Sequence, residues 1–255
     1  MGTARGDQTM SMKVLGVIPA RFRSTRFPGK PLADILGKPM IYHVYSASVK
    51  ASLLNDVIVA TDDQRIVEAC DKYDIPSILT SEKHPTGTDR VAEVAQNIQA
   101  DLYVNIQGDE PMMKPNTIDA AVRPFFEQSD FDVTNLCTKI LEPDEVIDTN
   151  VIKVVRSPES YAIYLSRQPI PYPKDRRDVI YYKQVCVYAF RKDALVRFVN
   201  TPQTYLERVE GVEILRFLEL GMKIKFVEET EGGTYAVDSP SDLARVTELM
   251  AAGNI

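Results

Sequence analysis

The sequence predicts an α/β fold, with a mostly parallel central sheet flanked by helices and an inserted region of mixed β structure. Apolar runs typical of strands buried on both faces alternate with helix-like periodicity through residues 14–106. From about residue 132 the chain changes to closely spaced segments rich in Val, Ile, Tyr and Thr. We therefore expect one domain over residues 12–255, with the inserted region at roughly 132–200.

The first half is expected to supply the parallel strands and their crossover helices. Apolar runs predict buried strands at 14–18, 56–61, 77–80 and 102–106. Apolar residues at helical spacing, such as Val91, Ala95 and Ile98, predict helices at 39–50, 65–73 and 88–98. Alternation of this kind implies right-handed βαβ units and a largely parallel sheet.

The second half is expected to be more mixed. Segments of high β-propensity predict strands at 132–140, 153–156, 161–165, 182–190 and 224–227. A helix is expected at 205–220, with Gly221 as its stop signal. A last helix is expected at 239–250, with Ser239 as its N-cap and Pro240 in its first turn.

Composition excludes several classes of function. A net charge of −6 argues against general nucleic-acid binding. The three cysteines lie far apart without a CxxC pair, which indicates reduced thiols in a cytoplasmic protein. Two histidines are too few to favour a His-centred metal site or a Ser-His-Asp triad. No apolar run is long enough for a membrane span and none resembles a signal peptide, and residues 1–11 are typical of a disordered lead or a cloning remnant.

The segment after the first strand, RFRSTRFPGK at residues 21–30, carries the most informative chemistry. Arg21, Arg23, Arg26 and Lys30 give it four positive charges and no acid, in a chain that is acidic as a whole. Guanidinium forks and backbone N–H groups match phosphate oxygens in geometry and charge. A buried strand that leads into such a loop favours a phosphate site, although charge runs are often only solvated surface.

Acidic residues follow other strands of the same predicted sheet. Asp62-Asp63 and Asp109-Glu110 come at two strand ends, where open parallel sheets bind their ligands. A triphosphate with Mg²⁺ would satisfy both signs of charge, with Asp109 as a metal ligand and Asp238 as a candidate second ligand. Each of these two aspartates could instead be a turn or helix cap. The chain contains neither GxxxxGK[ST] nor GxGxxG, so kinase, ATPase and dehydrogenase interpretations lack their usual support.

Six motifs occur in order along nearly the whole chain, from about residue 13 to 250: IPARFRSTRFPGKPL, VATDD, TGTDR, VNIQGDEP, KVV…YAIYLSR…IP and VDSPSDL. In this combination the sequence resembles the CMP-3-deoxy-manno-octulosonate (CMP-Kdo) synthetases, the cytidylyltransferases that activate Kdo for lipopolysaccharide assembly. The resemblance implies a Rossmann-like nucleotidyltransferase domain, usually a homodimer, that uses CTP and Mg²⁺. It also implies in-line attack of the sugar's C2 hydroxyl on the α-phosphate of CTP with release of pyrophosphate. The inserted region would serve acceptor binding and dimerisation.

The resemblance implies roles for individual residues. Catalytic roles would fall on Arg21, Arg26, Lys30 and Asp109. Contacts with the nucleotide would be made by Pro19, Ala20, Arg21, Ser24, Arg26, Lys30, Thr61, Thr86, Gly87, Thr88, Arg90 and Gln107. Contacts with the acceptor would be made by Gln107, Arg167, Gln184, Tyr188, Glu210 and Glu213, and Mg²⁺ would be held by Asp109 and Asp238. Arg90 could instead simply pair with a neighbouring acid.

The chain departs from the family pattern where the family contacts its sugar. Gln184 and Cys186 stand where the family usually has His and Gly, and Ile214 stands where it has Gln. A pocket that reads a hydroxyl is sensitive to such losses, so one hypothesis is a different small acid as acceptor, such as another 2-keto-3-deoxy sugar acid or a phosphonate. The other hypothesis is Kdo itself, with Gln184 replacing the imidazole as hydrogen-bond donor. A sialic-acid-type synthetase and a catalytically silent nucleotide-binding protein are the remaining alternatives.

Overall fold

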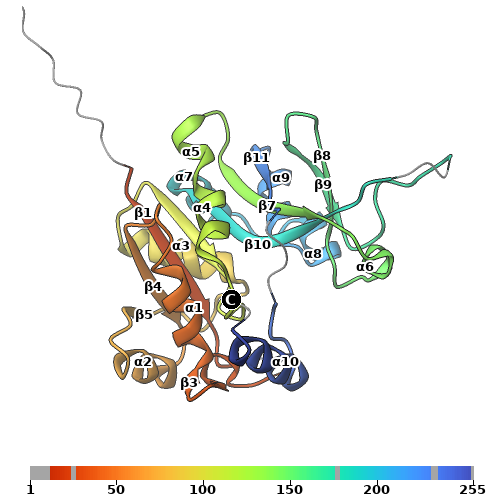
Figure 1. Cartoon of the computed structure of the whole chain (residues 1–255). Coiled ribbons are helices and arrows are strands. Elements are labelled where there is room, and N and C mark those ends of the chain that lie inside the picture. Colours follow the sequence, from red (N-terminus) through yellow and green to blue (C-terminus); the bar gives the residue numbers. More distant parts are fainter. Residues whose placement is uncertain (1–11, 24–26, 176–178, 231–234, 254–255) are drawn as a thin grey trace, which may run out of the picture.

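The computed structural model describes residues 12–23, 27–175, 179–230 and 235–253. Across these residues a nine-stranded sheet runs in the order β11-β7-β10-β6-β1-β4-β5, with β8 and β9 branching from β10 (Figure 1). The strands are β1 (Val14–Ala20), β2 (Asp34–Ile35), β3 (Lys38–Pro39), β4 (Asp56–Thr61), β5 (Ser77–Leu79), β6 (Leu102–Ile106), β7 (Val133–Lys139), β8 (Lys153–Arg156), β9 (Ala162–Ser166), β10 (Tyr182–Arg191) and β11 (Ile224–Glu228). The helices are a 3₁₀ turn η1 (Lys30–Leu32), α1 (Met40–Ser48), α2 (Gln64–Asp71), α3 (Gly87–Asn97), α4 (Pro115–Val122), α5 (Pro124–Glu127), α6 (Pro143–Ile147), α7 (Lys192–Val199), α8 (Tyr205–Glu210), α9 (Ile214–Glu219) and α10 (Pro240–Ala251).

The sheet is mostly parallel, as the sequence predicted. Strands β6, β1, β4 and β5 are parallel neighbours, and β11 is parallel to β7. Strand β10 lies antiparallel between β6 and β7 and makes the sheet mixed. The carboxyl ends of β1, β4 and β6 therefore meet at one edge, where the basic loop and Asp109 follow their strands.

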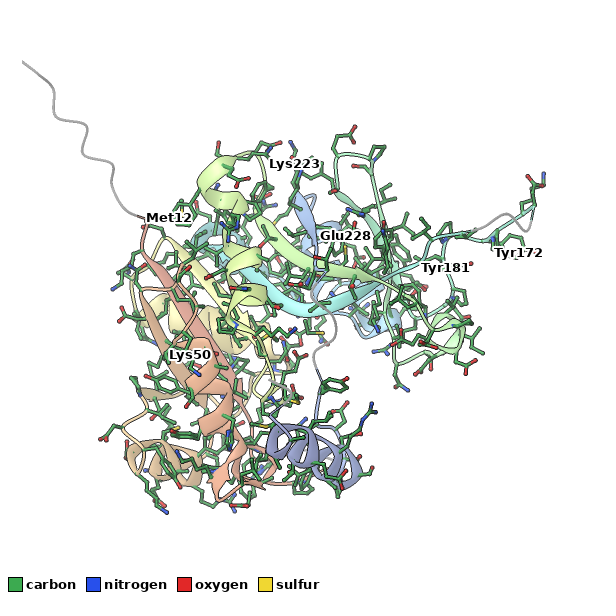
Figure 2. All side chains as sticks on the ribbon, in the orientation of Figure 1. Met12, Lys50, Tyr172, Tyr181, Lys223 and Glu228 are labelled. Atoms are coloured by element: carbon green, nitrogen blue, oxygen red, sulfur yellow. The ribbon has the colours of Figure 1, made fainter. Side chains whose placement is uncertain are left out.

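The expected inserted region, residues 132–200, contributes to the central sheet as well as to a projection from it. Strands β7 and β10 belong to the central order, whereas β8 and β9 pair beside the far end of β10. Figure 2 shows Tyr172 well away from the body of the molecule and Tyr181 closer to it. The role of this region in acceptor binding and dimerisation stays a prediction.

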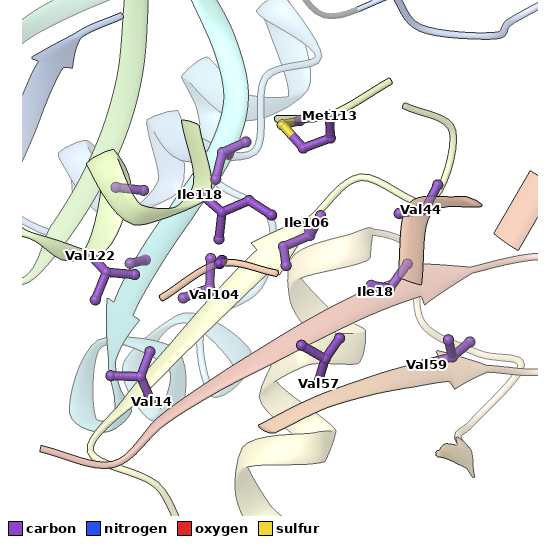
Figure 3. Close-up of a cluster of buried hydrophobic side chains, with 14 of the residues drawn as sticks. Val14, Ile18, Val44, Val57, Val59, Val104, Ile106, Met113, Ile118 and Val122 are labelled. Carbon is purple, nitrogen blue, oxygen red and sulfur yellow. The ribbon is translucent and has the colours of Figure 1, made fainter. Parts of the chain in front are cut away.

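Both faces of the sheet are covered, which explains the uninterrupted apolar run of β1. Val14 and Ile18 point to one face, where they pack with α1, α2 and α4 (Figure 3). Leu15 and Val17 point to the other face, where they pack with α3, α7 and α9. Apolar side chains on both faces of such a strand are buried, so the apolar residues form a continuous run in the sequence and do not alternate with polar ones.

Three expected helices are present close to their predicted bounds, and the final helix begins as predicted. Ser239 caps α10 by accepting a hydrogen bond from the Asp242 amide, with Pro240 at the first position. The helix expected at 205–220 is instead two helices, because Gly211 adopts a left-handed φ of 63° that ends α8. Gly221, with a φ of 71°, follows the end of α9 as predicted. Helices α4, α5, α6 and α7 were not predicted.

Candidate active site

A cleft of about 400 Å³ opens at the carboxyl ends of β1 and β6. It is lined by the residues Pro19, Ala20, Arg21, Arg23, Lys30, Pro31, Gly87, Arg90, Gln107, Gly108, Asp109, Glu213 and Asp238. These residues come from the basic loop, the start of α3, the turn after β6, the α8–α9 junction and the segment before α10. The topology therefore brings positive and negative side chains from distant parts of the sequence into one cleft.

Lys30 joins the two aspartates that the sequence marked as metal ligands. Its ammonium Nζ lies 2.6 Å from Oδ2 of Asp109 and 3.4 Å from Oδ1 of Asp238. The Val237 amide also donates to the Asp109 carbonyl at 2.9 Å, which ties the segment before α10 to the turn after β6. Two carboxylates thus converge on one point of positive charge in a partly buried setting.

Gly108 allows the turn carrying Asp109 to pass close to β1. A Cβ atom added at Gly108 would lie 2.7 Å from the Pro19 carbonyl oxygen and 3.5 Å from Cγ2 of Ile18. The carbonyl belongs to a backbone fixed in the sheet and cannot move aside. Glycine at 108 is therefore required for the approach of the Asp109 turn to the end of β1.

The basic loop places two described guanidinium groups on the cleft. Arg21 lines it and donates from NH1 to the Pro85 carbonyl at 3.3 Å. Arg23 also lines it, and its loose 3.9 Å ion pair with Glu82 leaves it largely exposed. The predicted contacts of Ser24 and Arg26 lie outside the described residues.

The TGTDR turn begins α3 at the rim of the cleft. Thr86 caps the helix through its Oγ1, which accepts from the Asp89 amide at 3.2 Å. Gly87 lines the cleft, and the Thr88 amide donates to Oε2 of Glu213 at 3.1 Å. Amides of a helix N-terminus favour an anion, and here the carboxylate of Glu213 accepts from one of them.

Arg90 is fully buried, and its guanidinium donates to Oδ2 of Asp62 at 2.8 Å and to the hydroxyl of Thr80. Burial lowers the pKa of Arg90, while the Asp62 carboxylate opposes that shift. Arg90 is thus paired with a neighbouring acid and also forms part of the cleft wall, and its contact with the nucleotide stays a prediction. Thr61 is buried and accepts from the Asp63 amide at 3.3 Å, away from the cleft lining.

A buried ion-pair network of Arg216, Glu207 and Asp89 lies next to Glu213 in the helices α8, α9 and α3. Arg216 donates from Nε and NH2 to the two carboxylate oxygens of Glu207, both at 2.6 Å. Its NH1 also lies 3.6 Å from Oδ1 of Asp89. The bidentate pair joins α8 and α9, and the contact with Asp89 links α9 to α3, whose Thr88 amide donates to Glu213.

Two of the predicted acceptor residues bind each other outside the cleft lining. The Arg167 amide donates to Oε2 of Glu210 at 2.9 Å, and its side-chain Nε donates to the Glu210 carbonyl at 2.5 Å. Arg167 also donates to the carbonyls of Gly211 and Thr149 at 3.2 and 2.8 Å. These contacts hold the junction between α8 and α9 in the shape that places Glu213 at the cleft.

Gln184 and Tyr188, two more of the predicted acceptor residues, lie on β10, whereas Gln107 and Glu213 line the cleft. Burial raises the pKa of Tyr188 well above its ordinary value, and nearby Cys186 and Glu213 raise it further. Burial likewise raises the pKa of the Cys186 thiol to about 12, with Glu110 as the next cause. Both groups are therefore neutral at physiological pH and lie near the acids of the cleft.

Asp109 and Asp238 suit a hard divalent cation. Their carboxylate oxygens are the donor type that Mg²⁺ prefers, and Mg²⁺ commonly uses one or two carboxylates together with water and phosphate oxygens. Among the described residues no group of three or more His, Cys, Asp or Glu side chains is arranged for a metal ion. The pair therefore fits a metal shared with a substrate, not one held entirely by protein.

Comparison with known proteins identifies the family. Residues 15–224 match the family profile described as cytidylyltransferase. A protein of Geotalea uraniireducens (strain Rf4) called 3-deoxy-manno-octulosonate cytidylyltransferase is 46% identical over 250 residues, which cover 94% of this chain and 99% of that protein. A protein of the same name from Solibacter usitatus (strain Ellin6076) is 47% identical over 244 residues, which cover 95% and 96%. The chain belongs to the 3-deoxy-manno-octulosonate cytidylyltransferase family.

Solved structures agree with this membership. A structure of CMP:2-keto-3-deoxy-manno-octonic acid synthetase complexed with CTP matches at a TM-score of 0.90 and 39% identity, over 94% of this chain and 99% of that one. A 4-diphosphocytidyl-2C-methyl-D-erythritol synthase from Anaerococcus prevotii matches at a TM-score of 0.63 but only 12% identity, so that similarity shows the fold alone. The family resemblance and the nucleotidyltransferase fold predicted from the sequence are confirmed, and this family member is an enzyme of the nucleotidyltransferase class.

The structure gathers many of the predicted residues of this cytidylyltransferase and leaves others apart. The cleft contains the predicted residues Pro19, Ala20, Arg21, Lys30, Gly87, Arg90, Gln107, Asp109, Glu213 and Asp238. Its described lining does not include Thr61, Thr86, Thr88, Arg167, Gln184, Tyr188 or Glu210. Arg23, Pro31 and Gly108 line it without having been predicted, although Arg23 shares the charge signal of its loop. Within the described residues no helix is both long and apolar enough to span a membrane.

Proposed function

We propose that this enzyme transfers CMP from CTP to the C2 hydroxyl of Kdo, releases pyrophosphate and uses Mg²⁺. The observation that carries the proposal is the convergence of Lys30, Asp109 and Asp238 beside Arg21 in one cleft. The names of the relatives, which are 3-deoxy-manno-octulosonate cytidylyltransferases, support Kdo as the acceptor. The CTP complex of the similar synthetase supports the nucleotide.

The charges of the cleft suit the transfer of a cytidylyl group. The acceptor oxygen forms a bond to the α-phosphorus, the bond from that phosphorus to the β-phosphate oxygen breaks, and the hydroxyl proton passes to solvent. Negative charge grows on the departing pyrophosphate, and Arg21, Arg23 and Lys30 lie on the cleft to stabilise it. Preorganised cations of this kind need no covalent intermediate.

Asp109 and Asp238 would hold the magnesium ion. When bound, Mg²⁺ would polarise phosphate oxygens and lower the pKa of the acceptor hydroxyl. Lys30 contacts both carboxylates, so it would keep them oriented and then lie beside the phosphates. Gly108 fixes the position of the Asp109 turn against β1.

The acceptor is expected at the end of the cleft that Gln107 and Glu213 line. Arg167 and Glu210 stabilise the junction behind Glu213 and would supply the neighbouring polar surface. Nε2 of Gln184 donates to Oδ1 of Asn135, a residue of the protein itself. The hypothesis of a different acceptor therefore stays open, in which the same CTP chemistry serves another small keto-sugar acid. By analogy with the family we also propose a cytoplasmic homodimer that acts in lipopolysaccharide biosynthesis.

A pyrophosphate-release assay tests the proposal. Purified enzyme is supplied with CTP, Mg²⁺ and, in separate reactions, Kdo, a sialic acid and other 2-keto-3-deoxy sugar acids. We expect turnover with Kdo, none when CTP alone is present, and none in the Asp109→Asn variant. Turnover with another acid but not with Kdo would show that the other acid is the acceptor. No turnover with any acid would favour a catalytically silent nucleotide-binding protein.

A further inference from the structure

Strand β10 carries an irregularity next to the cleft. In its pairing with β7, Val185 lies opposite Leu136, but the next residue of β7, Asn135, lies opposite Tyr188. Cys186 and Val187 are therefore extra residues on β10, and the ladder between the two strands is interrupted there. Figure 1 shows β10 as a strongly curved strand beneath β7. Bulges of this kind bend a strand and re-aim side chains beside active sites.

The side chain of Asn135 takes the place of the lost ladder hydrogen bonds. Asn135 is fully buried, and its Nδ2 donates to the carbonyls of both Val185, at 2.8 Å, and Val187, at 3.0 Å. These two carbonyls lie on either side of Cys186 in the chain. A buried carbonyl without a partner is destabilising, so this one carboxamide satisfies both acceptors that the bulge would otherwise leave unpaired.

The same carboxamide also fixes Gln184. Because Nδ2 of Asn135 serves the two carbonyls, only its Oδ1 is left to face Gln184, and Nε2 of Gln184 donates to it at 2.9 Å. Residue 184 must therefore present an N–H group toward Asn135. The orientation of both amides follows from the two backbone carbonyls, which accept only.

The bulge lies where β10 pairs with the end of β6. Val187 lies opposite Ile106, the last residue of β6, and the next residue of the chain, Gln107, lines the cleft, so this stretch of β10 lies beside the cleft. Glu110 and Glu213 also contribute to the raised pKa values of Cys186 and Tyr188. On its other side β10 is regular, with Tyr188 opposite Asn105 of β6. Asn135 thus holds residues 184–188 beside the end of β6, next to the described lining of the cleft.

We propose that Asn135 is a positioning residue for the acceptor, holding the bulge of β10 and the amide of Gln184 so that Gln184, Cys186 and Tyr188 form one wall of the acceptor site. The identity of that site as an acceptor site rests on the function proposed above. The structural half of the inference, that Asn135 holds residues 184–188, does not depend on which acid is the acceptor.

Two variants and a matched control test the inference. Asn135→Ala removes all three hydrogen bonds. If that variant does not fold, Asn135→Ser is used instead, because its hydroxyl can donate to only one of the two carbonyls. Thr134→Val is the control, since Thr134 is the adjacent buried residue of β7 and donates to the Ala121 carbonyl at 2.5 Å on the other face. It removes a buried hydrogen bond from the same strand without touching the bulge.

Amide hydrogen exchange gives the first readout. We expect the rate of amide exchange at residues 184–188 to rise about tenfold or more in the Asn135 variants, because buried hydrogen bonds that hold these residues are lost. The rate should change little in Thr134→Val. Unchanged exchange at 184–188 in the Asn135 variants would overturn the inference. This readout needs no substrate, so it decides the structural claim even if the wild-type enzyme proves inactive with Kdo and the proposed function fails.

Steady-state kinetics give the second readout. We expect the acceptor KM to rise about tenfold in the Asn135 variants while the KM for CTP stays within about twofold, because the nucleotide side of the cleft is untouched. When Asn135→Ala is combined with Gln184→Ala, the loss should be smaller than the product of the two separate losses, because both variants remove the same hydrogen bond between residues 135 and 184. Equal shifts of both KM values, matching those of Thr134→Val, would show a merely structural role and overturn the inference.

Discussion

Replacing Gly108 by alanine should damage catalysis out of proportion to the single methyl group added. The new Cβ would lie 2.7 Å from the Pro19 carbonyl oxygen, about 0.7 Å inside the 3.4 Å at which ordinary contact begins. Since Pro19 is paired with Ala60 in the sheet, the turn that carries Asp109 must move instead. A shift of that size breaks the 2.6 Å contact between Asp109 and Lys30.

The expected loss follows from that displacement. Misplacing a catalytic group by about 1 Å lowers the rate by about 100-fold, so we expect kcat of Gly108→Ala to fall by roughly 30- to 100-fold. The overpacked contact should also lower the free energy of unfolding by about 1–3 kcal/mol. Pyrophosphate release with CTP and Kdo measures the first quantity, and urea unfolding measures the second.

Gly16→Ala is the matched control for this prediction. Its added Cβ would lie 2.9 Å from Cδ1 of Leu54 and 3.2 Å from Cγ2 of Val57, which are the ends of side chains that can yield. We expect a loss of about 1 kcal/mol in stability and a kcat within about twofold of wild type. A Gly108→Ala enzyme with wild-type kcat, or with only the losses of Gly16→Ala, would refute the reasoning about the backbone contact.

Three further predictions follow from buried charges and thiols. Lys30→Met should lower kcat by about 100-fold or more, because it removes a cation that contacts both of the carboxylates proposed to hold Mg²⁺; steady-state pyrophosphate release measures this. Arg216→Met should lower the free energy of unfolding by about 3–5 kcal/mol, because Glu207 is left buried without its bidentate partner; urea unfolding measures it. The free energy of unfolding should also fall as pH rises from about 9 to about 11, because burial raises the pKa of Cys70 and of Cys137 from 9.0 to about 11.

Each of these three has a result that would contradict it. Near wild-type kcat in Lys30→Met would show that the ammonium is dispensable. Adding Glu207→Leu to Arg216→Met should restore much of the lost stability, and no recovery would contradict the unpaired-carboxylate explanation. For the thiols, the folded protein retains protons that the unfolded chain has already released between pH 9 and 11, so unfolding is favoured there. A Cys70→Ala/Cys137→Ala variant with the same pH slope as wild type would assign the slope to other groups.

The sheet could be predicted from the sequence because both of its faces are covered. Apart from the exposed Asp56 at the start of β4, the side chains of β1, β4 and β6 are buried or partly buried, so these strands can be recognised in the sequence as apolar runs. The missed helices α4, α5 and α6 are short, but each begins with proline at its first position, at residues 115, 124 and 143. Proline at that position is a helix-start signal, and it could have revealed all three.

The division of the helix at 205–220 had no comparable local signal. Gly211 is compatible with either a weak helix interior or a left-handed end, and its conformation depends on contacts with Arg167, a residue 44 positions away. Long-range placement also limited the site prediction. Residue types marked Lys30, Asp109 and Asp238 correctly as cleft residues, but only the fold showed that one ammonium contacts both acids. Asn135 was missed because a single asparagine within a strand-like run carries no pattern.

The most direct test of the central claim is a ³¹P NMR time course with CTP, Mg²⁺ and Kdo. We predict that the three CTP phosphorus signals decline together while pyrophosphate and one phosphodiester signal, that of the CMP sugar, grow in equal amounts. Asp109→Asn should leave the CTP signals unchanged. Release of inorganic phosphate in place of pyrophosphate, or an equal rate in Asp109→Asn, would contradict cytidylyl transfer at this cleft.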